Sequence, residues 1–327
     1  MWFEALTGFS EESPEQVRRN ILLDGGELIS RVNGRRFTWG DLETPSMAEL
    51  RKRACLSQRS AGKTTVREVV ADAQELHKDD RNAGSLFQVA SQFNLLEMVS
   101  PSITPERGVG IYEYDRTQGP ACAIAAGAGT IYRHYFVNVN GKIGQSATNQ
   151  IDCLSDLGMA LENSDGHLWE VRNGYALASE SGLIEIADRL RASTESERDR
   201  LRGLLRIGIQ WNTQVTLDDC RHLVSQAYCS ALPVAYSRHP ASLWANFALL
   251  VLEASYEATF CAAIVNFQRT GNNRLFLTLL GGGAFGNETD WIVRAIKRSV
   301  ELYREHGLDV AIVSYGSSKP FLRTLTT

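Results

Sequence analysis

The sequence predicts an α/β fold in which helices cover a layered β-sheet. In the last third of the chain, a helix over residues 242–270 precedes a strand over 274–279, a glycine loop, a helix over 290–306 and a strand over 309–315. The apolar run 86–90 adds another buried strand. Such alternation is typical of sheets that bind ligands at the carboxyl ends of their strands. The chain has 327 residues, 43% of them hydrophobic, which is enough for a sizeable core.

Residues 1–80 are predicted to form a polar, mainly helical N-terminal extension that packs on the core. The dipeptide Asn33-Gly34 is the strongest short signal for a hairpin within it. Further on, we expect a helix that begins near Thr65 rather than the end of a phosphate-binding P-loop. Ser57 stands where the P-loop motif requires a glycine, and no apolar strand precedes it.

Residues 81–327 are predicted to form the α/β domain, with an insertion around residues 137–215. Small side chains fill residues 121–130, so a helix there can pack very close to a neighbouring backbone or ligand. Pro120 suits the first turn of that helix. Within the insertion, the charged stretch 185–205 indicates a solvated helix.

The most informative segment is the glycine-dense loop 278–287, which directly follows an apolar strand. Gly281, Gly282, Gly283 and Gly286 remove the β-carbons that would hold a ligand away from the backbone. They also permit the positive φ angles that aim several amides at one anion. A helix-compatible segment follows, and the amino end of a helix favours negative charge. The loop therefore predicts a phosphate site, the alternative being a tight turn that serves only close packing.

Composition excludes several other classes of protein. The net charge of -4 and the pI near 5.9 argue against a general nucleic-acid binder. The longest apolar runs, such as 243–252, are shorter than the roughly 18 residues of a membrane span, and the N-terminus lacks signal-peptide features. We expect a soluble, intracellular, cytoplasmic protein. The six cysteines contain no C-x-x-C pair, so we expect no disulfide framework, no metal and no cofactor.

Three consecutive segments together resemble the second half of a macrodomain. They are the helical stretch 255–264, the strand 275–278 and the loop 280–287. The loop sequence Gly-Ala-Phe-Gly is most similar to the poly(ADP-ribose) glycohydrolase branch of the macrodomain superfamily. Upstream, residues 87–94 resemble the strand and asparagine that face the distal ribose, and residues 117–123 occupy the place of the first ligand loop.

This resemblance implies a three-layer α/β/α fold with a mixed sheet and a cleft for ADP-ribose. Amides of Gly282–Gly286 would bind the diphosphate, and those of Gln118–Ala121 would approach the phosphate and distal ribose. Phe285 would cover the ribose or phosphate, and Tyr315 would stack on adenine unless it lies in the core. The ligand-binding residues expected on this basis are Thr117, Gln118, Gly119, Pro120, Ala121, Gly281, Gly282, Gly283, Ala284, Phe285, Gly286, Asn287 and Tyr315.

The chain departs from that family at the catalytic position. Hydrolases of the glycohydrolase branch carry paired glutamates just after the first ligand loop, where residues 121–126 contain no acid. Asp115 is the first candidate to activate water and Glu97 the second, although either carboxylate could instead cap a loop. Asn94 is expected to bind a ribose hydroxyl, because its amide both donates and accepts.

Three other polar residues have mainly structural interpretations. Glu257 lies among apolar residues of a helix, where a structural role is favoured over contact with the ligand loop. His134 is expected to be a satisfied histidine at a helix end. Cys122 lies near a helix start, where thiolates are stabilised, but no general base adjoins it in sequence.

The predicted function is an ADP-ribosyl glycohydrolase that cleaves a linkage at the distal ribose, with poly(ADP-ribose) among its possible substrates. The expected partners are ADP-ribose or an ADP-ribosylated protein or nucleic acid, and no membrane. The alternative is a non-catalytic module that binds ADP-ribose or a related NAD metabolite. A third possibility is an unrelated α/β enzyme that acts on a phosphorylated metabolite.

Overall fold

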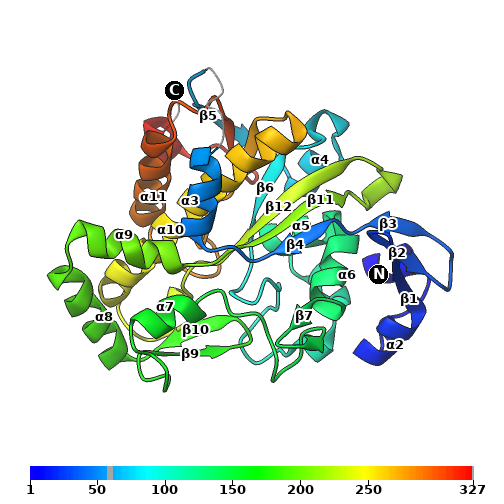
Figure 1. Cartoon of the computed structure of the whole chain (residues 1–327), viewed down its shortest axis with the longest axis horizontal. Coiled ribbons are helices and arrows are strands. Elements are labelled where there is room, and N and C mark those ends of the chain that lie inside the picture. Colours follow the sequence, from blue (N-terminus) through cyan, green and yellow to red (C-terminus); the bar gives the residue numbers. More distant parts are fainter. Residues whose placement is uncertain (57–61, 326–327) are drawn as a thin grey trace.

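A seven-stranded mixed β-sheet forms the centre of the computed structural model, which describes residues 1–56 and 62–325 (Figure 1). Across the sheet the strands run β4 (Asp41–Glu43), β11 (Gly208–Gln214), β12 (Leu223–Cys229), β6 (Leu86–Ala90), β13 (Arg274–Leu277), β14 (Asp309–Ser314) and β5 (Thr65–Val70). The five strands from β12 to β5 are parallel, whereas β11 is antiparallel to both of its neighbours. This confirms the predicted α/β fold with a mixed sheet.

Helices cover both faces of the sheet. Successive strand residues point to opposite sides, and in β6 buried apolar side chains lie on both sides. Leu86 packs in the core cluster beneath α3 (Met47–Leu56), α10 (Ala241–Thr270) and α11 (Thr289–Leu302). The next residue, Phe87, faces the other way and stacks on His77 of α4 (Ala73–Lys78). Figure 1 shows α4, α5 (Gln118–Ala125) and α6 (Gly127–Tyr135) on that second side. The three-layer α/β/α arrangement is therefore present.

Helix α10 is the central element of the first helical layer. It is long and apolar enough to cross a membrane, but 94% of its most apolar stretch is buried inside the protein. Its residues pack against α3, α11 and the strands β6, β12 and β13. A helix that is hydrophobic all round is expected in such a buried position.

The predicted boundary at residue 80 is wrong, because the N-terminal region completes the sheet. Strands β4 and β5 are its two edges, so this region is more than an extension on the core. The helix expected near Thr65 is strand β5, whose residues pair in parallel with β14 over its whole length. Its β-branched residues favour a strand. Ser57, which decided against a P-loop, lies outside the described residues.

The first 38 residues form a small unit beside α6. It consists of α1 (Trp2–Thr7), α2 (Pro14–Asn20) and a three-stranded sheet of β1 (Ile21–Asp24), β2 (Glu27–Ser30) and β3 (Arg36–Thr38). Strands β2 and β3 are the hairpin predicted around Asn33-Gly34. The small-residue helix expected over 121–130 is in fact two helices, α5 and α6, since Ala126 between them leaves helical geometry.

The insertion contributes to both the periphery and the sheet. Its elements are β7 (Asn138–Val139), β8 (Lys142–Ile143), α7 (Ser155–Ala160), β9 (Trp169–Arg172), β10 (Tyr175–Ala178), α8 (Glu180–Ala192) and α9 (Glu195–Leu204). The single helix predicted over 185–205 is split between α8 and α9, because Thr194 caps the start of α9 with a capping box. The predicted insertion ends in β11, which belongs to the main sheet.

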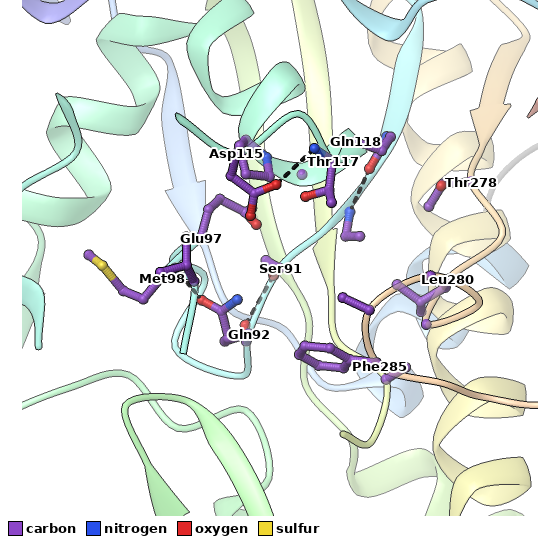
Figure 2. A pocket seen from close by; sticks show the side chains of 18 of the residues that line it. Ser91, Gln92, Glu97, Met98, Asp115, Thr117, Gln118, Thr278, Leu280 and Phe285 are labelled. Carbon is purple, nitrogen blue, oxygen red and sulfur yellow. Dashed lines mark hydrogen bonds between the residues drawn. The ribbon is translucent and has the colours of Figure 1, made fainter. Parts of the chain in front are cut away.

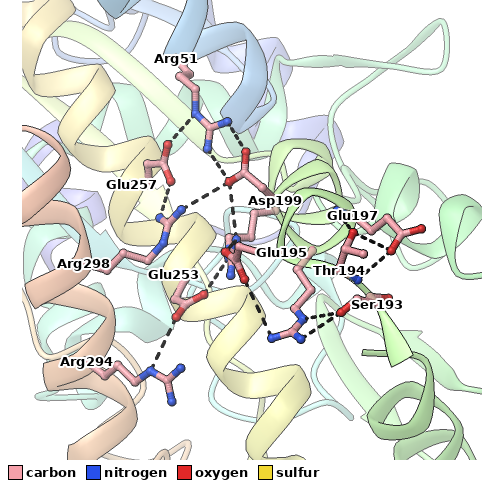
Figure 3. Close-up of polar contacts among 12 residues, drawn as sticks. Arg51, Ser193, Thr194, Glu195, Glu197, Asp199, Glu253, Glu257, Arg294 and Arg298 are labelled. Atoms are coloured by element: carbon pink, nitrogen blue, oxygen red, sulfur yellow. Dashed lines mark hydrogen bonds and ion pairs between the residues drawn. The ribbon is translucent and has the colours of Figure 1, made fainter. Parts of the chain in front are cut away.

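A network of partly buried ion pairs joins four helices on the first face of the sheet (Figure 3). Glu257 of α10 accepts hydrogen bonds from Arg51 of α3, at 2.6 Å, and from Arg298 of α11. Arg51 also binds Asp199 of α9. In the same network, Arg202 of α9 donates to another glutamate of α10. Glu257 is therefore a structural residue, as the sequence indicated.

Candidate active site

Two adjoining cavities open where the parallel strands β6, β13 and β14 end. Their volumes are about 190 Å³ and about 460 Å³. Both are lined by the loop after β13 and by the segment that starts α5, and they share the residues Thr117, Gln118, Thr278, Leu279 and Gly283. The two cavities thus meet at a waist between the glycine loop and the start of α5. This position at the carboxyl ends of parallel strands agrees with the sequence prediction.

The glycine loop presents main-chain amides to this waist. Gly281 and Gly286 adopt positive φ angles of 76° and 68°, which favour glycine. Within the described residues, no hydrogen bond is donated by the amides of Gly283, Ala284 or Phe285. All three residues line the smaller cavity, and Gly283 has no atom within 4 Å of where a β-carbon would be. The loop therefore offers unpaired donors beside open space.

Helix α10 holds the base of this loop in place. The hydroxyl of Tyr256 donates to the carbonyl of Thr278 at 2.8 Å and accepts from the amide of Leu280 at 2.9 Å. Tyr256 is fully buried, so these bonds are shielded from water. The loop is consequently a preformed feature with fixed ends rather than a free turn.

The start of α5 faces the glycine loop across the waist. The side chain of Gln118 is fixed by the last residues of β6, since it accepts from the amide of Ala90 and donates to the carbonyl of Gln88. In the described chain, the main-chain amides of Gln118 and Gly119 donate to no protein group. Unpaired amides at the amino end of a helix attract an anion.

Glu97 is a buried carboxyl in the wall of the smaller cavity. Glu97 is only 3% exposed, and its Oε1 atom has no hydrogen-bond partner among the described residues. Burial raises the pKa of Glu97 well above its usual value; the guanidinium of Arg133 opposes the rise, and the charge of Asp115 adds to it. Burial therefore favours the protonated form of the Glu97 carboxyl over its charged form.

Asp115 is a second carboxyl in the same cavity, next to Glu97 (Figure 2). Its Oδ1 atom accepts the amide of Thr117 at 2.8 Å, so it does cap the loop that leads into α5. Its second oxygen has no hydrogen-bond partner among the described residues, and Asp115 as a whole is half-buried. The two sequence-predicted carboxylates therefore meet in one cavity, one buried and one accessible.

Three aromatic residues line the smaller cavity. The rings of Tyr175, Tyr236 and Phe285 contact one another with centroids 5.2–5.6 Å apart. Tyr175 comes from β10 in the insertion and donates its hydroxyl to the carbonyl of Met98. Phe285 thus lines the cavity together with two tyrosines that the sequence analysis missed, and its contact with a ribose or phosphate stays a prediction.

The larger cavity has the more polar lining. Asp72, Arg116 and Lys319 line it together with Tyr315, which follows the last strand. Tyr315 is 76% exposed, so the alternative that it belongs to the core is wrong. Its ring is free to stack on a flat ligand. Among the described residues, no group of three or more His, Cys, Asp or Glu side chains could hold a metal ion.

Comparison with solved structures finds poly(ADP-ribose) glycohydrolases. The enzyme of Deinococcus radiodurans in complex with ADP-ribose aligns over 87% of this chain and 94% of its own, with 13% identity and a TM-score of 0.46. The enzyme of Thermomonospora curvata aligns over 94% and 91%, with 11% identity and a TM-score of 0.47. No protein-family model and no curated protein matches the sequence. These structures belong to the branch that the glycine loop resembles, but the likeness is distant.

Asn94 does not lie where the sequence placed it. Its residue is fully buried and lines neither cavity. Its amide nitrogen donates to Gln150, and its oxygen accepts from the amide of Leu96, so both ends of the side chain are used within the protein. A role as a ribose ligand does not fit this geometry.

Part of the glycine loop is also structural rather than ligand-facing. The amides of Gly282, Gly286 and Asn287 are bonded to carbonyls inside the loop. Gly286 and Asn287 line neither cavity, and the side chain of Asn287 donates to the carbonyl of Leu232. The predicted diphosphate site therefore narrows to the amides of residues 283–285.

Two residues near the site have the structural roles that the sequence favoured. Cys122 accepts a hydrogen bond from Gln118, and burial raises the pKa of its thiol well above the usual value, which disfavours the thiolate that a nucleophile requires. The Nε2 atom of His134 contacts the carbonyl of Pro105, and burial lowers the pKa of this histidine to about 4. Its Nδ1 atom has no hydrogen-bond partner among the described residues, so the expectation of a fully satisfied histidine is wrong for that atom. The remaining predicted ligand residues, Pro120, Ala121 and Gly281, line one cavity or the other.

Proposed function

We propose that this protein hydrolyses the glycosidic linkage of an ADP-ribosyl group at its distal ribose. The observation that supports this best is the pair of carboxyls, Glu97 and Asp115, in one cavity beside unpaired loop amides. A buried acid next to an accessible carboxylate is the arrangement that glycoside hydrolysis requires. The proposed activity is therefore that of a glycohydrolase.

The cleft suits an elongated ligand with a central anion. The diphosphate would lie at the waist, bound by amides of the glycine loop and by the amino end of α5. Adenosine would extend into the larger cavity toward Tyr315, and the distal ribose into the smaller cavity beneath Phe285. This orientation brings the anomeric carbon to the two carboxyls.

Each carboxyl has one chemical role in the proposed reaction. Neutral Glu97 gives its proton to the leaving oxygen as the bond from the anomeric carbon to that oxygen breaks. Asp115 accepts a proton from a water molecule as the water oxygen attacks the same carbon. The products are ADP-ribose with a free anomeric hydroxyl and the released hydroxyl group, so one water is consumed in each turnover.

Changing Asp115 tests the water-activating role. We expect Asp115→Asn to retain the bond to Thr117, because the amide oxygen still accepts, but to release ADP-ribose from modified substrates about a hundredfold more slowly. Release from mono- and poly(ADP-ribosylated) proteins is measured by chromatography, with ADP-ribose affinity by calorimetry as the control. Unchanged turnover in this variant would remove Asp115 from the mechanism.

A non-catalytic ADP-ribose module is the second candidate, favoured by the absence of acids in residues 121–126. The same assay separates the two functions. A parent protein that binds ADP-ribose but releases none from any ADP-ribosylated protein or nucleic acid is a reader. Calorimetry with AMP and ribose 5-phosphate tests the third possibility, since the two-cavity cleft should prefer the whole ADP-ribose molecule by a wide margin.

A further inference from the structure

The carboxylate of Glu11, near the N-terminus, forms hydrogen bonds with the segment that leads to Asp115. Glu11 lies between α1 and α2, and its side chain accepts the amides of Val109, at 3.0 Å, and Gly110, at 2.6 Å. The hydroxyl of Tyr135 donates to the same carboxylate. Glu11 thus bonds the amides at the start of a 3₁₀ helix nearly one hundred residues away in sequence, η3 (Gly110–Tyr114).

Residues 108–110 leave room for this carboxylate because two of them are glycines. A β-carbon at Gly108 would lie 2.4 Å from the Oε2 atom of Glu11, and one at Gly110 would lie 2.8 Å from it. Trp2 adds a second connection, because its indole nitrogen donates to the carbonyl of Val109 and its amide to Glu113. Residues 2–11 and 108–113 are therefore in contact at several points.

Helix η3 supports both carboxyls of the proposed active site. The hydroxyl of Tyr112 accepts the amide of Glu97 at 3.0 Å, which fixes the backbone of the buried acid. Asp115 is the residue that closes η3, with its amide bonded to the carbonyl of Tyr112. One short 3₁₀ helix, about 10 Å long, thereby links the Glu11 contact to both groups.

We propose that Glu11 is a positioning residue that sets the spacing of Glu97 and Asp115 through η3. This inference rests on the proposed glycohydrolase function. Glu11 does not contact the glycine loop, whose base is held by α10 instead. Loss of the Glu11 contacts should consequently impair the chemical step and leave ADP-ribose binding intact.

The substitution Glu11→Gln tests this role in the full-length protein. It preserves shape, but three donors surround the carboxylate, and an amide nitrogen in place of one oxygen leaves a donor facing a donor. We expect kcat to fall about tenfold, while the Kd for ADP-ribose stays within about twofold. The adjacent Glu12→Gln is the matched control, because Glu12 is exposed and its change should alter neither value.

A second variant gives an independent measurement if Glu11→Gln does not fold. Gly110→Ala would place a methyl group against the Glu11 carboxylate, and we expect the same loss of kcat with unchanged ADP-ribose affinity. Parental kcat in a folded Glu11 or Gly110 variant overturns the positioning role alone. Equal loss of kcat and affinity also overturns it, because the effect is then general. A parent protein without hydrolase activity overturns the proposed function, and the positioning role with it.

Discussion

Two glutamates of this protein are equally hidden from solvent but have opposite surroundings. Glu257, 1% exposed, is bonded to two arginines and to the hydroxyl of Tyr303 within the network that joins the helices. Glu97, 3% exposed, has one carboxyl oxygen without a partner among the described residues and lies at a cavity. Burial alone therefore does not distinguish a structural acid from a candidate catalytic one, whereas their hydrogen-bond partners differ.

The largest expected effect is loss of activity in Glu97→Gln. The amide has no proton to give to a leaving group, so we expect kcat to fall about a thousandfold. In the parent, kcat should decline as the pH rises through the raised pKa of Glu97, because only the protonated form is a general acid. Steady-state kinetics across pH measure both effects.

The stability of Glu97→Gln should not fall. The pKa of Glu97 is higher in the folded than in the unfolded chain, so the parent loses stability as the pH rises from the unfolded value toward the folded value. Glutamine carries no charge and removes that loss. A strongly destabilised variant, measured by denaturant unfolding at pH 7, would place Glu97 with the structural acids.

Glu257→Gln should show the reverse behaviour. It leaves Arg51 and Arg298 without their shared carboxylate in a buried position, and we expect the free energy of unfolding to fall by about 3 kcal/mol. Below the unfolding transition, kcat should equal that of the parent, because the network lies apart from the cavity. A kcat defect in the folded variant would contradict the division between the two regions.

The smallest of the expected effects concerns binding alone. Gly283→Val introduces a branched side chain into open space at the waist of the cleft. We expect ADP-ribose to bind about thirtyfold more weakly, the equivalent of about 2 kcal/mol for lost bonds to a charged group. Thermal unfolding should change little, because Gly283, unlike Gly281, does not adopt a positive φ angle. Gly283→Ala, with a smaller side chain, should have a smaller effect.

Sequence reasoning located the glycine loop and its flanking elements because the signals there are local. Strand β13, the four glycines and helix α11 follow one another within about thirty residues, and each has a clear apolar or turn pattern. Tyr315 and the start of α5 could be placed for the same reason, since each adjoins the end of a strand or helix. The α/β fold and the position of the glycine loop could thus be predicted from short segments.

The burial of Glu97 could not be predicted from its local sequence. Its neighbours in sequence indicate only a loop, whereas its burial arises from Tyr112, Gly119 and Arg133, which come from three other segments. Asn94, three residues earlier, is expected at the ligand because residues 87–94 resemble the macrodomain strand and asparagine that face the distal ribose. In the fold it turns into the protein, where Gln150 of the insertion pairs with it.

Edge strand β5 was missed for a related reason. It contains two charged residues, and Val66 is its only fully buried member in the described chain, so its sequence lacks the apolar run of a central strand. Only pairing with β14, more than two hundred residues later, makes it a strand. Tyr175 likewise reaches the cavity through a hairpin of the insertion, which carries no chemical signature in the sequence.

Gly119 has no space for a side chain where α5 packs against Ala90 and Glu97. A β-carbon there would lie 2.0 Å from the carbonyl oxygen of Ala90 and 2.3 Å from the Oε2 atom of Glu97. The acid could be shortened by mutation, but a peptide carbonyl is common to every amino acid. A selection for second-site suppressors of Gly119→Ala should accordingly return only true revertants.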